Sequence, residues 1–223
     1  NPFTLTNASL SYVFSSFSRS QMMDLQVLSN GATLSTIIEK PYSSNSHIVS
    51  LQAGSKIMPL ASDIGMKVTY NYSGSPVLVN GTENFSVNHV MAIDPMITTD
   101  FATWINTSYR PTFLFFANRL GNDGNYRKQS SQKHPVGIHV FPAKNHYVSL
   151  TYEYYKYRGY SASFLDLSYR ISFPKKRTDL QIGWNNILQA NEYTEVSISP
   201  YLMTVTTIML RPSQIWFTYK FSF

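Results

Sequence analysis

The chain ends in Gln214-Ile215-Trp216-Phe217-Thr218-Tyr219-Lys220-Phe221-Ser222-Phe223, and this stretch decides the fold. Every second residue in it is apolar or aromatic: Ile215, Phe217, Tyr219, Phe221 and Phe223. Neighbouring side chains on a β-strand point to opposite faces, so the spacing predicts a strand with one apolar face. The other face of this strand carries Trp216, Thr218, Lys220 and Ser222.

The same alternation recurs towards the N-terminus, most clearly in residues 10–14, 64–72, 165–173 and 180–184. No segment has a convincing helical period. Alternation and turn residues together predict about eleven strands. The predicted spans are 7–17, 21–39, 46–58, 62–75, 83–94, 98–117, 133–142, 145–158, 161–173, 178–188 and 213–223.

The composition indicates a sheet that meets lipid. Charged residues make up 13% of the chain and aromatic residues 15%, whereas soluble domains carry about 25% charged residues. No apolar run approaches the roughly 20 residues of a membrane-spanning helix. Strands with one apolar and one polar face have this composition in outer-membrane barrels. A soluble β-sandwich shares it.

The charged residues and the missing cysteines exclude several function classes. The net charge is +6, but the only basic triplet is Lys175-Lys176-Arg177, so we expect no nucleic-acid partner. Without cysteine there is no thiolate metal site and no cysteine nucleophile. His134 and His139 are five residues apart in an extended segment, on opposite faces, and do not form a metal pair.

Catalysis is not expected. His89, Asp94 and Asp100 flank a predicted turn at the periplasmic rim. A hydrolase would be more useful at the outer rim. No Gly-rich phosphate loop, Gly-x-Ser-x-Gly elbow or His-Glu-x-x-His motif occurs. We therefore predict no enzyme, no metal and no cofactor.

The connections between predicted strands alternate in length. The tight ones are at Ser18-Arg19-Ser20, Pro59-Leu60-Ala61, Pro95-Met96-Ile97, Pro142-Ala143-Lys144 and Pro174-Lys175-Lys176-Arg177. The others are mostly longer, as at residues 118–132 and 189–212. Outer-membrane barrels have short periplasmic turns and long extracellular loops. The sequence thus predicts an antiparallel transmembrane β-barrel in the bacterial outer membrane.

Strand parity gives a further expectation. Bacterial single-chain barrels have an even strand number, with both termini in the periplasm. If the last of eleven strands ends in the periplasm, the first strand begins outside. Residues 1–223 are then the C-terminal part of a single, larger barrel domain.

The segment 164–223 carries three motifs of one family. The first is Phe164-Leu165-Asp166-Leu167-Ser168-Tyr169 followed by Lys175-Lys176 and Asp179-Leu180-Gln181-Ile182. The second is Asn185-Asn186-Ile187-Leu188 with Tyr193, and the third is Leu210-Arg211-Pro212-Ser213-Gln214 leading into Lys220-Phe221-Ser222-Phe223. This segment resembles the C-terminal region of TonB-dependent outer-membrane transporters, most closely those of Bacteroidota. Ser213 stands where that family commonly has a second arginine.

The resemblance implies a barrel of about 22 strands around an N-terminal plug, which imports a scarce nutrient such as an oligosaccharide, a peptide or a chelated metal. It implies as partners the outer-membrane lipid, the barrel-assembly machinery, a surface lipoprotein and an inner-membrane energising protein, the last two through regions absent here. The family-motif positions are Asn186, Leu188, Tyr193, Arg211 and Pro212. The resemblance also implies that the strand with Ile215, Phe217, Tyr219, Phe221 and Phe223 is the closing strand that the barrel-assembly machinery recognises.

Two alternatives stay open: an autonomous small outer-membrane barrel acting as a porin or enzyme, and a soluble β-sandwich binding module. The run Tyr152-Glu153-Tyr154-Tyr155-Lys156-Tyr157-Arg158 is interpreted as part of an interfacial aromatic girdle rather than as a sugar-stacking surface.

Overall fold

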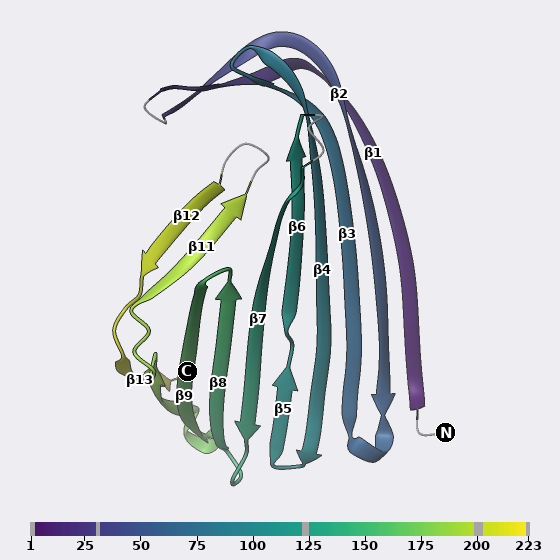
Figure 1. The fold of residues 1–223 in the computed structure, drawn as a ribbon. Coiled ribbons are helices and arrows are strands. Elements are labelled where there is room, and N and C mark those ends of the chain that lie inside the picture. Colours follow the sequence, from purple (N-terminus) through teal and green to yellow (C-terminus); the bar gives the residue numbers. More distant parts are fainter. Residues whose placement is uncertain (1–2, 30–31, 122–124, 199–202, 222–223) are drawn as a thin grey trace.

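The computed structural model describes residues 3–29, 32–121, 125–198 and 203–221, and it is all-β (Figure 1). No helix in these ranges is long and apolar enough to cross a membrane. Two short 3₁₀ turns occur, η1 (Met58–Leu60) and η2 (Pro174–Lys176). The strands are β1 (Phe3–Val27), β2 (Thr33–Ile57), β3 (Ser62–Val79), β4 (Thr82–Ala102), β5 (Ile105–Tyr109), β6 (Thr112–Leu120), β7 (Arg127–Val140), β8 (His146–Tyr157), β9 (Tyr160–Phe173), β10 (Thr178–Asn185), β11 (Glu192–Ile198), β12 (Met203–Met209) and β13 (Gln214–Phe221).

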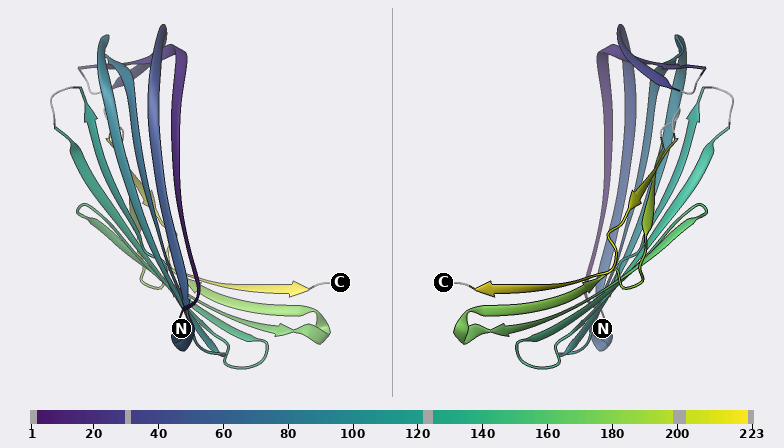
Figure 2. Two further views of the ribbon diagram at one scale, coloured as in Figure 1. Left: turned by 90° about the vertical axis from the view of Figure 1, so that its right-hand side faces the viewer. Right: turned by 90° about the vertical axis from the view of Figure 1, so that its left-hand side faces the viewer.

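Eleven of these strands form one antiparallel sheet in which chain neighbours pair. The order runs from β1 at one edge through β2, β3, β4, β5, β7, β8, β9 and β10 to β13 at the other. Because β5 and β6 both pair with β4 and with β7, they share one row. The remaining two strands, β11 and β12, form a separate hairpin. Figure 2 shows that the large sheet is curled, and Figure 1 shows its two edges, β1 and β13, on opposite sides of the molecule.

The predicted turn at Pro95-Met96-Ile97 is wrong, because β4 continues through it to Ala102. Ile93 pairs with Phe113 and Ile97 with Tyr109, which places Pro95 opposite Pro111 between β5 and β6. A proline cannot donate a ladder hydrogen bond, so strands accept it where pairing is interrupted. The reversal occurs instead at residues 103–104.

The predicted turn at Ser18-Arg19-Ser20 is also wrong. The β1–β2 register shifts between Arg19 and Gln21, so this segment is an irregularity within a strand of 25 residues. Bulges bend strands without reversing them. Beyond this point the β1–β2 hairpin arches over β3 (Figure 1), where Asp24 pairs in parallel with Leu78.

Five buried apolar side chains lie on the strands of the arch and on the strand next to them: Met22 and Leu25 in β1, Val77 and Leu78 in β3, and Val87 in β4. Each is at most 9% exposed. These side chains come from three strands that a turn at residues 18–20 would have kept apart. Here the fold is held by an ordinary hydrophobic core.

Three predicted turns are confirmed. Residues 58–61 and 174–177 reverse through η1 and η2, each followed by a residue in the left-handed region, and residues 141–145 join β7 to β8. All lie at the rim that is lowest in Figure 1, together with residues 103–104. The predicted long loop at 118–132 is wrong, since β6 runs to Leu120 and β7 starts at Arg127.

With the strand boundaries corrected, the sheet has ten rows, because β5 and β6 share one. An even number of antiparallel rows lets β1 start and β13 end at the same rim, the lower one in Figures 1 and 2. The expectation that the first strand starts at the opposite rim is therefore wrong. The parity argument for missing strands fails with it.

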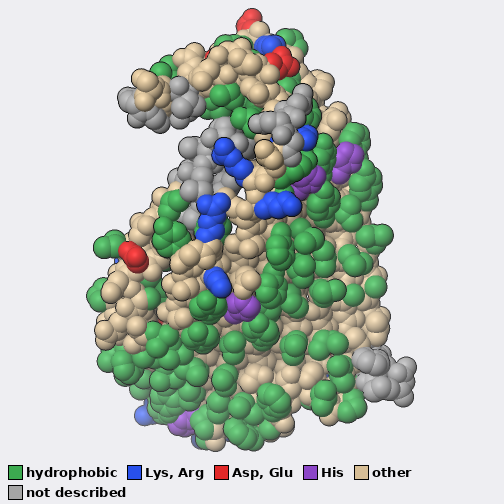
Figure 3. Space-filling model, viewed as in Figure 1, with side chains coloured by type: hydrophobic (Ala, Val, Ile, Leu, Met, Phe, Trp, Pro, Cys, Tyr) green, Lys and Arg blue, Asp and Glu red, His purple; other side chains and the backbone are tan. Residues whose placement is uncertain are grey.

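The cross-strand register sorts the side chains into two continuous faces. On one face Leu51 lies opposite Leu10 and Val68, and this row continues through Ile93 to Phe113. Figure 3 looks onto this apolar face and shows hydrophobic side chains over much of its lower part. The opposite face carries mostly Ser, Thr, Asn and charged side chains, and it is hollowed by a cavity.

Candidate functional site

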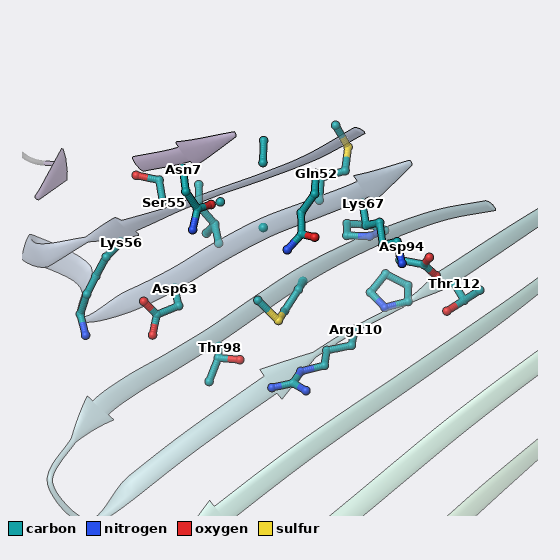
Figure 4. Close-up of a pocket in the computed structure, with 18 residues that line it drawn as sticks. Asn7, Gln52, Ser55, Lys56, Asp63, Lys67, Asp94, Thr98, Arg110 and Thr112 are labelled. Carbon is teal, nitrogen blue, oxygen red and sulfur yellow. The ribbon is translucent and has the colours of Figure 1, made fainter. Parts of the chain in front are cut away.

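A cavity lies on the polar face near the rim of short turns. It has a volume of about 730 Å³ and is lined by β1 to β4 and the β5–β6 row. Figure 4 shows Lys56, Asp63 and Thr98 around one end, and Gln52, Lys67 and Asp94 around the other.

Five charged side chains line this cavity, and the register places four of them in opposed pairs. Lys56 lies directly opposite Asp63, and Lys67 lies opposite Asp94. The fifth, Arg110, lies in the next row, between β5 and β6. No ion pair within 4.0 Å links these five groups to any described residue. Three cations and two carboxylates thus remain available to a polar ligand or to a protein segment.

Glycines keep the floor of the cavity low. Gly54 and Gly65 are cross-strand partners, so no side chain rises from either position. A Cβ atom at position 54 would lie 3.0 Å from Oδ1 of Asn7, and one at position 65 would lie 3.3 Å from Cε of Met96. Glycine in a strand often marks such a close approach.

Gly183 and Trp216 form a second polar-face feature, directly opposite each other on β10 and β13. The indole ring of Trp216 lies across Gly183, where a Cβ atom would overlap Cε2 and Cζ2 of the ring. Its Nε1 donates to Oδ1 of Asn185 at 3.1 Å. The alternation in the last strand predicts that Trp216 lies on the polar face, and this is confirmed. The contact of its ring with Gly183 could not be predicted from the alternation.

Asn186, one of the family-motif positions, ties together the two ends of the 186–213 connection. Its backbone N–H donates to the carboxylate of Asp166 at 2.8 Å, and its side-chain amide donates to the carbonyls of Ala190 and Arg211 at 2.8 and 3.0 Å. Its Oδ1 accepts from the N–H of Ala190. With φ at 51°, Asn186 occupies a region that asparagine tolerates better than most residues.

The other family-motif positions surround this connection. Tyr193 in β11 packs against Tyr155 and Phe164, with ring centroids 4.8 and 6.3 Å apart. These contacts hold the β11–β12 hairpin against the polar face. Leu188 is 48% exposed, and Pro212 lies between β12 and β13. Ser213, where the family commonly has arginine, accepts a hydrogen bond from Nε1 of Trp184 at 2.6 Å.

On the apolar face, pairs of tyrosine and histidine follow both borders of the hydrophobic band. The hydroxyls of Tyr12, Tyr70 and Tyr109 lie 2.6–2.8 Å from Nδ1 of His47, His89 and His134. Near the rim of short turns, Tyr169 and His146 make the same contact at 2.5 Å. The sequence hides these pairs because their members are 19 to 35 residues apart.

The spacing of the two borders is measured along β8. His134 pairs with Tyr154 at one border, and His146 lies eight residues back along the strand at the other. At roughly 3.3 Å per residue this separation is about 26 Å along the strand, or about 20 Å of height for a strand tilted by 35–45°. Outer-membrane barrels carry an apolar band about 25 Å tall between two aromatic girdles.

The aromatic run of β8 divides between the two faces. Tyr152 and Tyr154 lie on the apolar face, whereas Glu153, Tyr155 and Tyr157 lie on the polar face. Tyr157 is buried, and Tyr155 is covered by Tyr193. The run therefore offers no continuous stacking surface to a sugar.

The residues considered for catalysis are not brought together. His89 and Asp94 lie on opposite faces of β4, and Asp100 near its end accepts a hydrogen bond from Asn106. His134 stacks on Tyr109 on the apolar face, whereas His139 contacts Tyr147 and Ser149 on the polar face. The described ranges contain no cluster of three metal-ligating side chains.

The last strand pairs with β10 as the final row of the sheet. Ile215, Phe217, Tyr219 and Phe221 share its apolar face and are 52–70% exposed. Phe223 lies outside the described residues.

No protein-family model, curated protein or solved structure matches this chain.

Proposed function

We propose that this chain is part of the wall of an outer-membrane β-barrel, of the kind that TonB-dependent transporters use to import a scarce nutrient. The observation that carries the proposal is the continuous apolar face, bordered on both sides by aromatic rows, on a sheet whose other face is polar and hollowed. A curled sheet with this arrangement fits between lipid and an aqueous lumen. The 730 Å³ cavity is then part of the lumen surface.

The two edges of the sheet support a larger barrel. On their outer sides β1 and β13 pair with no described strand. Unpaired backbone groups are costly in hydrocarbon, so a membrane-spanning sheet must close. We propose that further strands of the same polypeptide close it, as the family resemblance implies. Transport of a ligand and the plug, lipoprotein and energising partners rest on that resemblance alone.

An autonomous small barrel is the second candidate. The even number of rows, with β1 starting and β13 ending at one rim, fits this candidate and a larger barrel with an even strand number equally. A soluble sandwich is disfavoured, because in the described residues no second sheet covers the apolar face and Leu51 and Phe217 stay 42% and 66% exposed.

Electrophoresis of the native polypeptide from isolated membranes tests the proposal. We expect it to require detergent for extraction and to migrate faster unheated than boiled, because a closed barrel stays compact in the detergent. The boiled mass should be far above the 25.4 kDa of this chain. Heat-dependent migration at about 25.4 kDa would select the autonomous barrel instead. Solubility without detergent would contradict both membrane proposals.

A further inference from the structure

Two cations stand above the hydrophobic band on the apolar face of neighbouring strands. They are Arg119 in β6 and Lys128 in β7. Lys128 pairs with Ala117 and Arg127 with Asn118, so Arg119 lies opposite Tyr126 and diagonally from Lys128. Figure 3 shows Lys and Arg side chains along this upper border of the band.

Arg119 is held in place by a ring contact, and no ion pair links it to another described residue. Its guanidinium carbon lies 5.1 Å from the centre of the Tyr126 ring, and Tyr126 in turn meets the ring of His89 edge-on at 5.5 Å. The Nε atom of Arg119 is buried and has no hydrogen-bond partner among the described residues. An unpartnered buried donor on a cation is costly unless a ligand or water satisfies it.

The spacing of the two cations suits a phosphate group. Diagonal cross-strand neighbours lie about 7–8 Å apart, which two long side chains easily span. Arginine and lysine are the residues that most often bind phosphate oxygens. On the described parts of this face of β6, β7 and β8 there is no carboxylate to compete, since the side chains between the cations and the girdle are Ala117, Ser130 and Gln132.

The surface next to these cations is apolar. Phe115 in β6 is 40% exposed and lies opposite Met91 in β4, one pair below Ala117 and His89. A molecule that contacts both the two cations and the apolar surface of Phe115 and Met91 needs a phosphate at the cations and hydrocarbon along the apolar surface. Free phosphate satisfies only the first.

We propose that Arg119 and Lys128 bind the phosphate of a lipid headgroup whose acyl chains lie along Phe115 and Met91. This inference rests on the proposed function, because it places the apolar face in lipid. Tyr126 positions the Arg119 guanidinium for this contact.

The test measures lipid retention by the native polypeptide that contains these residues, folded in neutral detergent micelles, using native mass spectrometry. Dioleoyl phosphatidic acid is compared with dioleoylglycerol, which has the same acyl chains and no phosphate. The variant is Arg119→Gln with Lys128→Gln. The matched control is Lys144→Gln with Lys175→Gln, which removes the same charge at the opposite rim. Inorganic phosphate at millimolar concentration is added in a separate arm.

We expect wild type and control to bind phosphatidic acid at least about tenfold more tightly than dioleoylglycerol, and the Arg119/Lys128 variant to lose this preference. Equal retention by variant and control, or complete displacement of the lipid by inorganic phosphate, would overturn the inference. Heat-dependent migration of every sample is recorded in parallel. If it is absent from wild type, the proposed function has failed, whereas its presence without phosphate preference refutes only the lipid site.

Discussion

Arginine in place of Leu51 should destabilise the folded protein in a bilayer by about 2–4 kcal/mol, the cost of a cation at the midplane of a barrel's lipid face. Leu51 lies in the middle of the apolar face, between Leu10 and Val68, and is 42% exposed. No described side chain covers it, so the new charge would meet hydrocarbon.

Gln52→Arg is the matched control. Gln52 is the next residue in the same strand and lines the polar cavity, where a longer polar side chain has room. We expect this variant to lose less than about 1 kcal/mol, as exposed polar substitutions usually do. The measurement is the urea dependence of the heat-modifiable band in lipid vesicles. Equal destabilisation by both arginines would contradict the assignment of the two faces.

The second large effect is expected at Gly183. Alanine there should cost about 1–3 kcal/mol, because its Cβ atom would displace the Trp216 ring and break the hydrogen bond to Asn185. Gly159→Ala is the control, since nothing lies within 4 Å of a Cβ atom at that turn.

A double variant separates packing from backbone effects. If the clash with the indole is the cause, Gly183→Ala should cost much less in a Trp216→Ala background than in the wild type. The same urea titration measures all four proteins. Additive losses would show that glycine is needed at position 183 for its backbone and not for the ring.

The strand pattern was predictable from sequence because period-two alternation is a local property. It is strongest in β3, β9 and β13, where the apolar set matches the face that the structure exposes. The wrong turn predictions occur where a residue type is compatible both with a turn and with an irregular strand. Pro95 predicts a turn, but proline is also tolerated in a strand opposite an interrupted ladder, and only the register with Pro111 reveals this.

Long-range register explains what else was missed. The Ser18-Arg19-Ser20 segment has turn-like residues, and the bulge becomes visible only from its pairing with the 39–42 segment of β2. The Tyr–His pairs and the Arg119–Tyr126 contact likewise depend on which strands become neighbours. Asn186 was flagged by its motif, but its bonds to Ala190 and Arg211 require the whole 186–213 connection.

Spin-label accessibility along β3 tests the central claim most directly. The chain has no cysteine, so single cysteines at Met66, Lys67, Val68, Thr69 and Tyr70 each give one reporter. In lipid vesicles we expect labels at 66, 68 and 70 to collide mainly with oxygen, which concentrates in hydrocarbon. Labels at 67 and 69 should show no such preference. Loss of this period of two, with all five labels meeting a water-soluble nickel chelate equally, would contradict a membrane-spanning sheet.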